Sequence, residues 1–502
     1  MRAEIDESFG VLPHPTLADA ALTRARDLGA THAQFRLDRV RTARSFLRDG
    51  DRQGSQDETD IGIAVRVLRR GAWGFAASTR LTPAAAVGVA EEAVAVADAV
   101  ATLGGRRAEP VEEPVYHNEV WASAPLIDPF SVPEEDRVAI LREWTGRLRA
   151  APEIDQVLAK LVVTRENKFY ADLAGTVTLQ QRVRLHPQLL VSGHDSRAGR
   201  SVSLRTVGPP TARGLEYLSG QGWDWDGELA ALPAQLAEKL RAEPVEPGHH
   251  DLVLDPSHLW LTVHESVGHA TELDRALGHE ISYAGTTFAT PAGLGSLRYG
   301  SSQMNVRADR TVPHGLATIG FDDEGVAARS WNLVEDGVLT GFQFDRSTAA
   351  AIGAPGSAGC AFAESARHLP LSRMPNVSLL PAPGGPSTDE LISAVGEGIY
   401  LAGSDSFSID PRRETFQFSA QRAHRIHRGR LVGQLAGVAY QARTVDFWAA
   451  LSALGGERSY RLFGADLCGK GQPLQVAAAS HGCPGAVFSG IRVVDTAGTG
   501  AR

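Results

Sequence analysis

One stretch, residues 264–269, constrains this 502-residue sequence more than any other. It reads His-Glu-Ser-Val-Gly-His, so two imidazoles flank a carboxylate. The apolar run before it predicts a buried helix that begins at Ser257 as the N-cap. Imidazole is the commonest metal ligand in proteins. A glutamate beside the first of two spaced histidines is the general base of zinc hydrolases. The stretch therefore predicts a metal-dependent hydrolytic site.

The spacing of the two histidines predicts an unusual helix. His264 and His269 are one residue further apart than in the His-Glu-x-x-His motif. On a regular α-helix their side chains would point about 140° apart, at roughly 100° per residue, so they would not share one ion. A π-bulge absorbs the extra residue. Gly268 is the expected place for it, because no side chain crowds the turn there.

A catalytic zinc ion takes three protein ligands and leaves one position for water, so a third ligand is needed. The sequence offers Glu272 and Cys468, with His481 and Cys483 as rivals. Cys468 is favoured, because the glycines beside it allow close approach of the backbone. Lys470 would also favour the thiolate form that binds metals.

Further motifs accompany these residues in order along the chain. They are residues 60–66, 73–75, 174–176 and 180–181 in the first half, and 251–257, 272–275, 319–325, 373–376 and 468–470 in the second. In content and order they resemble the TldD/PmbA family of metallopeptidases, and the resemblance covers nearly the whole chain. One departure is the run Cys-Gly-Lys-Gly-Gln at 468–472, which is one residue shorter than the family's common form. It puts the shape of this loop in doubt.

The resemblance implies zinc-dependent hydrolysis of peptide bonds, with Zn²⁺ held by His264, His269 and Cys468. Glu265 would take a proton from the attacking water and pass it to the leaving amine. A ligand set with one thiolate makes zinc a weaker Lewis acid than three neutral imidazoles would, which leaves more of the work to Glu265.

Two further residues are expected to support this site. Glu272 would accept the second ring proton of a ligand histidine and so orient it. Arg373 would bind the carboxylate or backbone of the substrate, or form a structural salt bridge. Residues 322–325, Asp-Asp-Glu-Gly, lack the ligand spacing of a calcium loop and are interpreted as a turn, which in the family lies near the substrate cleft.

The resemblance also implies a substrate class and a partner. Members of the family act on small or unfolded peptides, in precursor-peptide maturation or antitoxin turnover. TldD-type chains usually pair with a related TldE/PmbA-type subunit that lacks the zinc motif. Since this chain keeps the motif, we expect it to be the catalytic subunit of such a heterodimer, or to form a homodimer.

Two other classes of function stay open. The chain could be a non-catalytic peptide-binding subunit with a structural zinc, although the intact Glu265 speaks against this. It could instead be a cysteine hydrolase with Cys468 as the nucleophile, which would need no metal and would resist chelators. Cys360 is expected to be buried and inert, and His481 and Cys483 are more often structural residues than ligands.

Composition excludes several classes. The formal net charge of −9 argues against a nucleic-acid partner, which would require a basic face. Three cysteines cannot build a disulfide framework and indicate a reducing compartment. The N-terminus is acidic and lacks the apolar core of a signal peptide. No run reaches about 18 uncharged apolar residues. We therefore expect a cytoplasmic protein that does not span a membrane.

The order of predicted elements favours an α+β fold in two parts. Residues 1–243 are expected to form an α/β domain, because helical and alternating patterns follow one another. The run 242–248 contains two prolines and a glycine and marks the boundary. Residues 244–502 are expected to form a β-rich catalytic region around the metal-binding helix.

Several elements have sharper signals. Residues 60–78 predict a hairpin with its turn at Arg70-Gly71. Thr82-Pro83 predicts the start of a helix that ends near 103. Short strands are predicted at 33–37, 44–48, 157–164, 168–173, 176–185 and 188–192, hairpins at 331–344 and 416–436, and helices at 134–150, 233–241 and 444–454.

Overall fold

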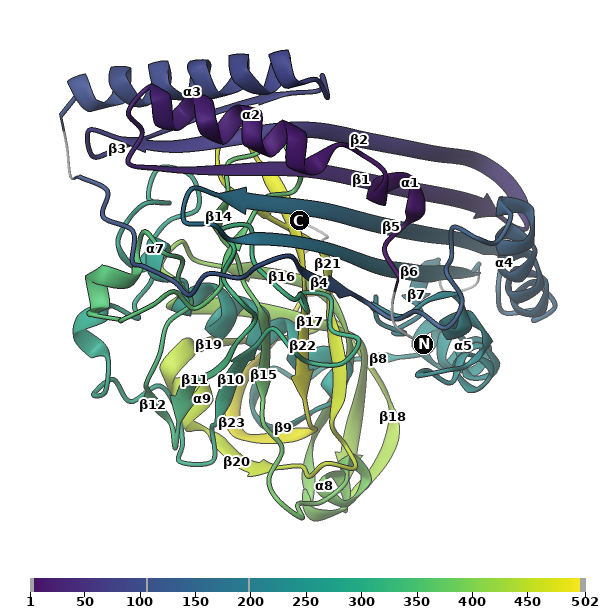
Figure 1. Ribbon diagram of the computed structural model, residues 1–502. Coiled ribbons are helices and arrows are strands. Elements are labelled where there is room, and N and C mark those ends of the chain that lie inside the picture. The colour runs from purple at the N-terminus through teal and green to yellow at the C-terminus, as the bar shows by residue number, and fades with distance from the viewer. Residues whose placement is uncertain (1–3, 105–106, 197–198, 497–502) are drawn as a thin grey trace.

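The computed structural model describes residues 4–104, 107–196 and 199–496. The N-terminal region is built on a sheet of long strands in the order β3-β2-β1-β5-β6-β4, with β7 beside β6 (Figure 1). Neighbouring strands pair antiparallel, except for β4, which runs parallel to β6. The strands are β1 (His32–Arg48), β2 (Asp51–Arg69), β3 (Ala72–Ser78), β4 (Glu119–Ala122), β5 (Gln156–Asp172), β6 (Val177–Asp195) and β7 (Arg200–Arg205).

Helices cover one face of this sheet at its two ends. On β5, Val157 and Leu161 pack against the core of α4 and α5, and Phe169 packs against the core of α2 and α3. These residues lie an even number of positions apart, so they point to the same face of the strand. The helices of this region are α1 (Glu7–Gly10), α2 (His14–Asp27), α3 (Pro83–Thr102), α4 (Glu134–Arg149) and α5 (Trp225–Leu240).

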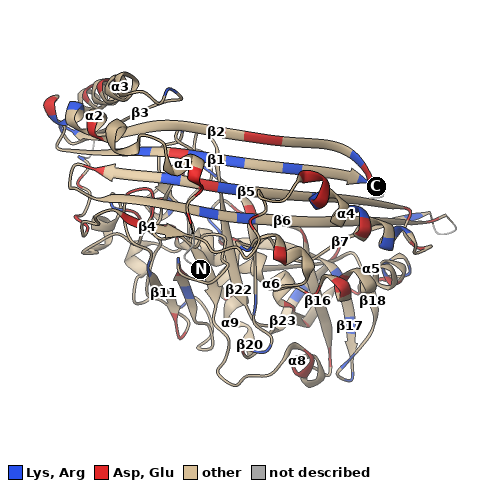
Figure 2. Ribbon diagram, turned by 45° about the vertical axis from the view of Figure 1, so that its right-hand side comes forward, with Lys and Arg blue, Asp and Glu red and all other residues tan. Residues whose placement is uncertain are grey.

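The other face of the sheet is polar and rests on the C-terminal region. Lys168 pairs with Asp323 at 2.6 Å, and Arg66 pairs with Glu324 at 2.5 Å. The Gln180 amide donates to the carbonyl of Phe321 at 2.7 Å. Figure 2 shows the charged segments along the middle of β1, β5 and β6. The turn predicted at 322–325 is present, and its carboxylates join the two regions.

The C-terminal region holds a mixed sheet in the order β16-β9-β23-β19-β17-β18-β8, with β20 beside β23. Its strands are β8 (Glu243–Pro244), β9 (Gly248–Leu254), β16 (Glu397–Ile409), β17 (Thr415–His427), β18 (Arg430–Ala436), β19 (Val438–Arg443), β20 (Leu451–Leu454) and β23 (Ala486–Asp495). In Figure 1 this region lies beneath the long N-terminal sheet.

Smaller sheets and short helices complete the C-terminal region. The strands are β10 (Val306–Asp309), β11 (Ser330–Glu335), β12 (Val338–Leu339), β13 (Ala361–Phe362), β14 (Leu371–Ser372), β15 (Asn376–Leu379), β21 (Arg461–Lys470) and β22 (Gln475–Cys483). The helices are α6 (Pro256–Val263), α7 (Leu273–Ala276), α8 (Thr388–Ala394) and α9 (Thr444–Ala449). Within the described residues, no helix combines the length and apolar character needed to cross a membrane.

The predicted α+β class is confirmed. The hairpin with its turn at Arg70-Gly71 is present, and Thr82 caps α3 by accepting a hydrogen bond from the Ala85 amide. Some bounds were wrong. The six short strands predicted in the first half merge into β1, β5 and β6, and Pro233 lies inside α5. Residues 444–454 divide into α9 and β20. The boundary after residue 243 stays a prediction.

Candidate metal centre

The helix α6 carries the motif into the interior of the C-terminal region. It begins at Asp255, whose carboxylate accepts a hydrogen bond from the Ser257 amide, and Pro256 follows at the first helical position. The predicted N-cap, Ser257, was therefore wrong. Proline at that position has a fixed φ suited to the helix and lacks the amide that would need a partner.

The predicted π-bulge is confirmed, because residues His264–Gly268 form a π-helical turn. Such a turn weakens the regular backbone ladder, and side chains bond to several of its carbonyls. The hydroxyl of Ser266 donates to the carbonyl of Thr262 at 2.5 Å, and that of Tyr299 donates to the carbonyl of Ser266 at 2.5 Å. The hydroxyl of Thr271 donates to the carbonyl of Val267 at 2.9 Å. These buried donors stabilise the distorted turn.

Gly268 is required for a different reason from the one predicted. Its backbone angles, φ −53° and ψ −64°, are ordinary for a helix. A Cβ atom at this position would lie 2.6 Å from the sulfur of Met374. The glycine therefore allows close packing of Met374 against the turn, rather than a special backbone conformation.

The structure brings the three predicted ligands together. The ligand atoms of His264, His269 and Cys468 all lie within 4.8 Å of one another. The Cys468 sulfur lies 3.4 Å from Nε2 of His269, and the two imidazole centroids are 4.7 Å apart. Cys468 comes from β21, where the pairing with β22 shifts register between Ala465 and Cys468.

Each ligand histidine is backed at its Nδ1 atom. The Nδ1 of His264 lies 2.7 Å from Nε2 of His481, whose own Nδ1 lies 2.8 Å from the carbonyl of Val377. The carbonyl can only accept, so His481 donates from Nδ1 and accepts from His264 at Nε2. His264 therefore keeps its Nε2 lone pair for a ligand role. His481 supports a ligand histidine, a role the sequence did not reveal.

His269 is held in the way predicted for Glu272. Its Nδ1 lies 3.0 Å from the Glu272 carboxylate, which leaves Nε2 facing Cys468. Burial alone would raise the pKa of Glu272, but Lys470 and His269 hold that pKa well below the ordinary range. Lys470 lies 3.3 Å from Glu272 and 2.8 Å from Asp274. The lysine thus bonds to acidic groups behind the site.

The donor set fits a metal ion such as zinc. Burial lowers the pKa of His264 well below its ordinary value and that of His269 to about 3, so both rings are neutral near pH 7. In the absence of a metal, burial raises the pKa of Cys468 to about 11, which Arg373 and Lys470 oppose. Two neutral imidazoles and one thiol converging in a buried pocket form a ligand set typical of zinc.

Glu265 lies on the π-helical turn and has one partner that the sequence did not predict. Nη1 of Arg413 donates to the Oε2 atom of Glu265 at 2.5 Å. Arg413 lies in the connection between β16 and β17, with a positive φ of 60°. The Thr444 hydroxyl donates to the backbone carbonyl of Arg413 at 2.6 Å. Burial raises the pKa of Glu265, and Arg413 opposes that shift. No sequence pattern marks this contact across 148 residues.

Arg373 lies beneath the cluster, 1% exposed. Its guanidinium donates to the backbone carbonyl of Cys468 and so fixes the ligand strand from behind. Of the other candidates, Cys360 is buried, with a pKa raised by burial to about 12. Cys483 is buried against the carbonyl of Pro256 at 3.5 Å and is not a member of the cluster of three ligands.

Comparison with known proteins identifies the family. The family model described as PmbA/TldA metallopeptidase C-terminal domain matches residues 247–495, and the model for domain 1 of the same metallopeptidases matches residues 33–97. The chain belongs to the PmbA/TldD family of metallopeptidases. The predicted class of enzyme is thereby confirmed at the level of the family.

Relatives in this family cover nearly all of the chain. A metalloprotease of Methanothermobacter thermautotrophicus is 28% identical over 466 residues, which are 89% of this chain and 92% of the relative. The zinc metalloprotease TldD homolog of Saccharolobus solfataricus is 25% identical over 86% of this chain and 90% of its own length. The crystal structure of TldE from Thermococcus kodakarensis matches with a TM-score of 0.75 at 14% identity, over 95% of this chain and all of that one. This last likeness concerns the fold alone.

Proposed function

We propose that the chain is a zinc-dependent peptidase and the catalytic subunit of its complex. The observation that supports this most directly is the convergence of His264, His269 and Cys468 on the turn that also carries Glu265. Zinc bound by these three residues would supply Lewis-acid activation of a water molecule and of the scissile carbonyl.

In this proposal the residues of the chain move the proton. Glu265 accepts the proton of the attacking water and delivers it to the leaving amine. Arg413 donates a hydrogen bond to the Oε2 atom of that carboxylate, so Oε1 is the oxygen that accepts the proton. His481 and Glu272 keep the ligand rings in the orientation that points both Nε2 atoms at one centre. Zinc analysis of the purified chain should give one ion per active chain, lost in His264→Ala and His269→Ala.

The proposed substrates are small or unfolded peptides, as in precursor-peptide maturation or antitoxin turnover. Glu265 is only 6% exposed and His264 only 4%. A folded protein surface would not reach groups at that depth, whereas an extended chain would. The proposed setting is the cytoplasm, with no nucleic-acid partner.

The proposed partner is a TldE/PmbA-type subunit without the zinc motif, with a homodimer as the alternative. The resemblance of the fold to TldE is consistent with assembly from related chains. Expressed alone, the chain should dimerise and cleave peptides weakly, and added partner should raise the rate. A fully active monomer would overturn this part of the proposal.

Two alternatives are weighed against this proposal. The 3.4 Å contact between Cys468 and His269 has the composition of a Cys–His pair, which favours a cysteine hydrolase. The raised pKa of Cys468 opposes it. A purely structural zinc is the second alternative, and the Glu265–Arg413 contact beside the ligands opposes it. Treatment with a chelator distinguishes a cysteine hydrolase from a zinc peptidase, because only the cysteine hydrolase would keep its activity.

The decisive experiment is Glu265→Gln, which keeps the size of the side chain and removes the base. Peptide cleavage should fall by about 10²–10⁴-fold. Zinc content, measured by elemental analysis, should stay unchanged. The matched control is Glu335→Gln at an exposed position on β11. If cleavage stays within a few-fold of the unmodified protein, Glu265 is not the base. If zinc is lost, Glu265 is a structural residue.

A further inference from the structure

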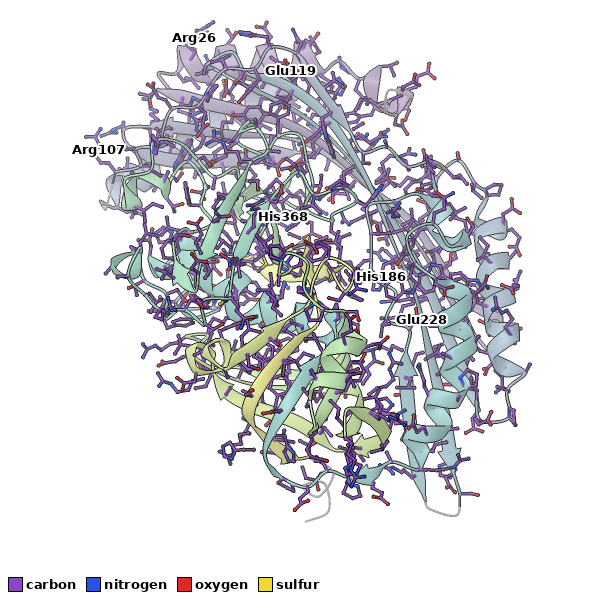
Figure 3. All side chains as sticks on the ribbon, turned by 90° about the horizontal axis from the view of Figure 1, so that it is seen from below. Arg26, Arg107, Glu119, His186, Glu228 and His368 are labelled. Atoms are coloured by element: carbon purple, nitrogen blue, oxygen red, sulfur yellow. The ribbon has the colours of Figure 1, made fainter. Side chains whose placement is uncertain are left out.

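A large cavity lies outside the metal centre, where α5 and the loop before it face β17 and β21. Its volume is about 710 Å³. One side is aromatic and includes Trp223 and Trp225, and the other side carries Arg205, Arg422 and Arg461. Figure 3 labels Glu228, a residue of α5 that lines this cavity. The mechanism above does not use these groups.

Each acidic residue that lines the cavity already has a hydrogen-bond or ion-pair partner in the protein. Asp224 caps α5 by accepting from the Gly227 amide at 2.9 Å, and Asp226 pairs with Arg147 at 2.7 Å. The Glu228 carboxylate accepts from the indole nitrogen of Trp223 at 2.5 Å and from two backbone amides. Burial raises the pKa of Glu228, and the hydrogen bonds to its carboxylate and the charge of Arg422 oppose that shift.

The basic residues of the cavity differ in how they are paired. Arg205 donates to the carbonyl of Ser404 at 2.8 Å and lies 3.9 Å from Asp405, and Arg461 donates to backbone carbonyls of the loop before its strand. In the described part of the chain, the side chain of Arg422 forms no hydrogen bond or ion pair, although its charge lowers the pKa of Glu228. Lys239 lies nearby. Burial lowers its pKa, Asp405 opposes that shift, and the charges of Arg205 and Arg422 add to it. The lining holds three arginines and three acidic residues, and among the described residues the side chain of Arg422 has no hydrogen-bonded partner there.

A smaller cavity adjoins this one and is lined in part by α6, the helix that precedes the metal-binding turn. This second cavity, of about 270 Å³, shares Arg205 with the first and is lined by Trp260 of α6 and Asp466 of β21. The ring of Trp260 stacks 6.1 Å from that of His481, which backs a ligand histidine. Asp466 precedes the ligand Cys468 by two residues on the same strand. From Arg461 to Cys468 the strand spans roughly 23 Å, at about 3.3 Å per residue.

We propose that the cavity around Arg422 binds a carboxylate of the peptide substrate, at a distance of about five to seven extended residues from the scissile bond. The carboxylate belongs either to the peptide C-terminus or to an acidic side chain. A guanidinium group recognises it by paired hydrogen bonds, and the neighbouring indoles accommodate an apolar residue beside it. This inference rests on the proposed peptidase function and adds a substrate class to it.

The test measures binding rather than cleavage. The zinc-loaded Glu265→Gln protein is titrated into labelled peptides of about eight residues, and binding is followed by fluorescence anisotropy. One peptide has a free C-terminus and no acidic side chain, a second is its C-terminal amide, and a third is the amide with a single glutamate. Arg422→Gln, Arg422→Lys and Arg425→Gln are introduced into the same background. Arg425 lies on the same strand and lines a different cavity.

At least one carboxylate-bearing peptide should bind roughly 10-fold more tightly than the neutral amide. Arg422→Gln should abolish this difference, whereas Arg422→Lys and Arg425→Gln should preserve it. A preference carried by the first peptide identifies the C-terminus as the source, and one carried by the third identifies the side chain. Equal affinity for all three peptides, or a preference that survives Arg422→Gln, would overturn the proposal. Cleavage by the unmodified protein is measured separately, so failure of the peptidase function is recognised by itself.

Discussion

Arg413 lies outside the motif but donates a hydrogen bond to its glutamate, Glu265. Hydrogen bonds to charged groups contribute about 1.5–3 kcal/mol. Losing the contact to Glu265 should therefore lower kcat by roughly 10- to 100-fold. We expect Arg413→Gln to show this loss with KM and zinc content little changed, and Arg413→Lys to restore part of it. The control is Arg412→Gln, in the same loop but with an exposed side chain. Equal effects of the two Gln variants would mean that the loop matters only for folding.

The support of His264 by His481 gives a second prediction at the level of residues. Groups that orient ligand histidines typically contribute 10- to 100-fold in metal affinity, as a rough measure. His481→Phe keeps a ring beside Trp260 but removes the acceptor for Nδ1 of His264. Zinc affinity, measured by competition with a chelator, should fall by about that factor. His249→Phe, at an exposed position on β9, should leave it unchanged. Unchanged affinity in His481→Phe would show that the ring orientation is set by packing alone.

The chemistry within the motif could be predicted from the sequence because it is local. His264, Glu265 and His269 lie within one turn, so their spacing alone predicted the π-helical distortion that is observed. Arg413 and His481 could not be found in this way. Their contacts cross 148 and 217 residues and depend on how β16, β17 and β22 pack around α6.

At the level of elements, the close packing of the π-helical turn predicts a specific sensitivity. In Gly268→Ala the new methyl group would meet the sulfur of Met374 at 2.6 Å. Overpacking of this kind costs about 1–3 kcal/mol. The free energy of unfolding in denaturant should fall by that amount, and zinc affinity should fall with it. Adding Met374→Ala should restore zinc affinity to Gly268→Ala, because it opens the space. If the double variant binds zinc no better, the glycine serves the backbone after all.

The long strands show where prediction of elements failed and why. Residues 165–167 read Arg-Glu-Asn and look like an interruption between the two short strands predicted at 157–164 and 168–173. In the structure they continue β5, and each side chain has a partner: Arg165 pairs with Asp6 and Asp128, Glu166 with Arg182, and Asn167 with Gln181. A run of polar residues predicts a loop when these partners, distant in sequence, are unknown. Turns with their own local signal, such as Arg70-Gly71, were predicted correctly.

At the scale of the whole molecule, the two regions meet across charged groups rather than an apolar seam. The metal ligands come from the C-terminal region, but the cavity around Arg422 is completed by α5 and the loop before it. The turn at Asp323 and Glu324 is held by cations of the N-terminal sheet. The relative position of the two regions therefore sets how far the cavity around Arg422 lies from the metal ligands.

Glu166 lies on the face of the N-terminal sheet that rests on the C-terminal region, and its charge provides a test of what stabilises that face. Burial alone would raise its pKa, but Arg182 and Arg184 hold that pKa below the ordinary value of 4.5. Arg182 in turn donates to the carbonyl of Leu316 in the C-terminal region at 2.6 Å. Because the folded-state pKa is lowered, the stabilisation is fully present above pH 4.5 and is lost as the pH falls toward the lowered pKa.

Glu166→Gln should therefore reduce the free energy of unfolding by about 3–5 kcal/mol near neutral pH, since two guanidinium groups lose a buried counter-charge. The difference from the unmodified protein should shrink when unfolding is measured at about pH 3.5, where the carboxyl of the unfolded chain is mostly protonated. Glu58→Gln, whose side chain is 68% exposed beside Arg44, should change stability little at either pH. A difference for Glu166→Gln that stays constant from neutral to acid pH would mean that its charge does not stabilise this face, and that the arginines are held by their backbone contacts instead.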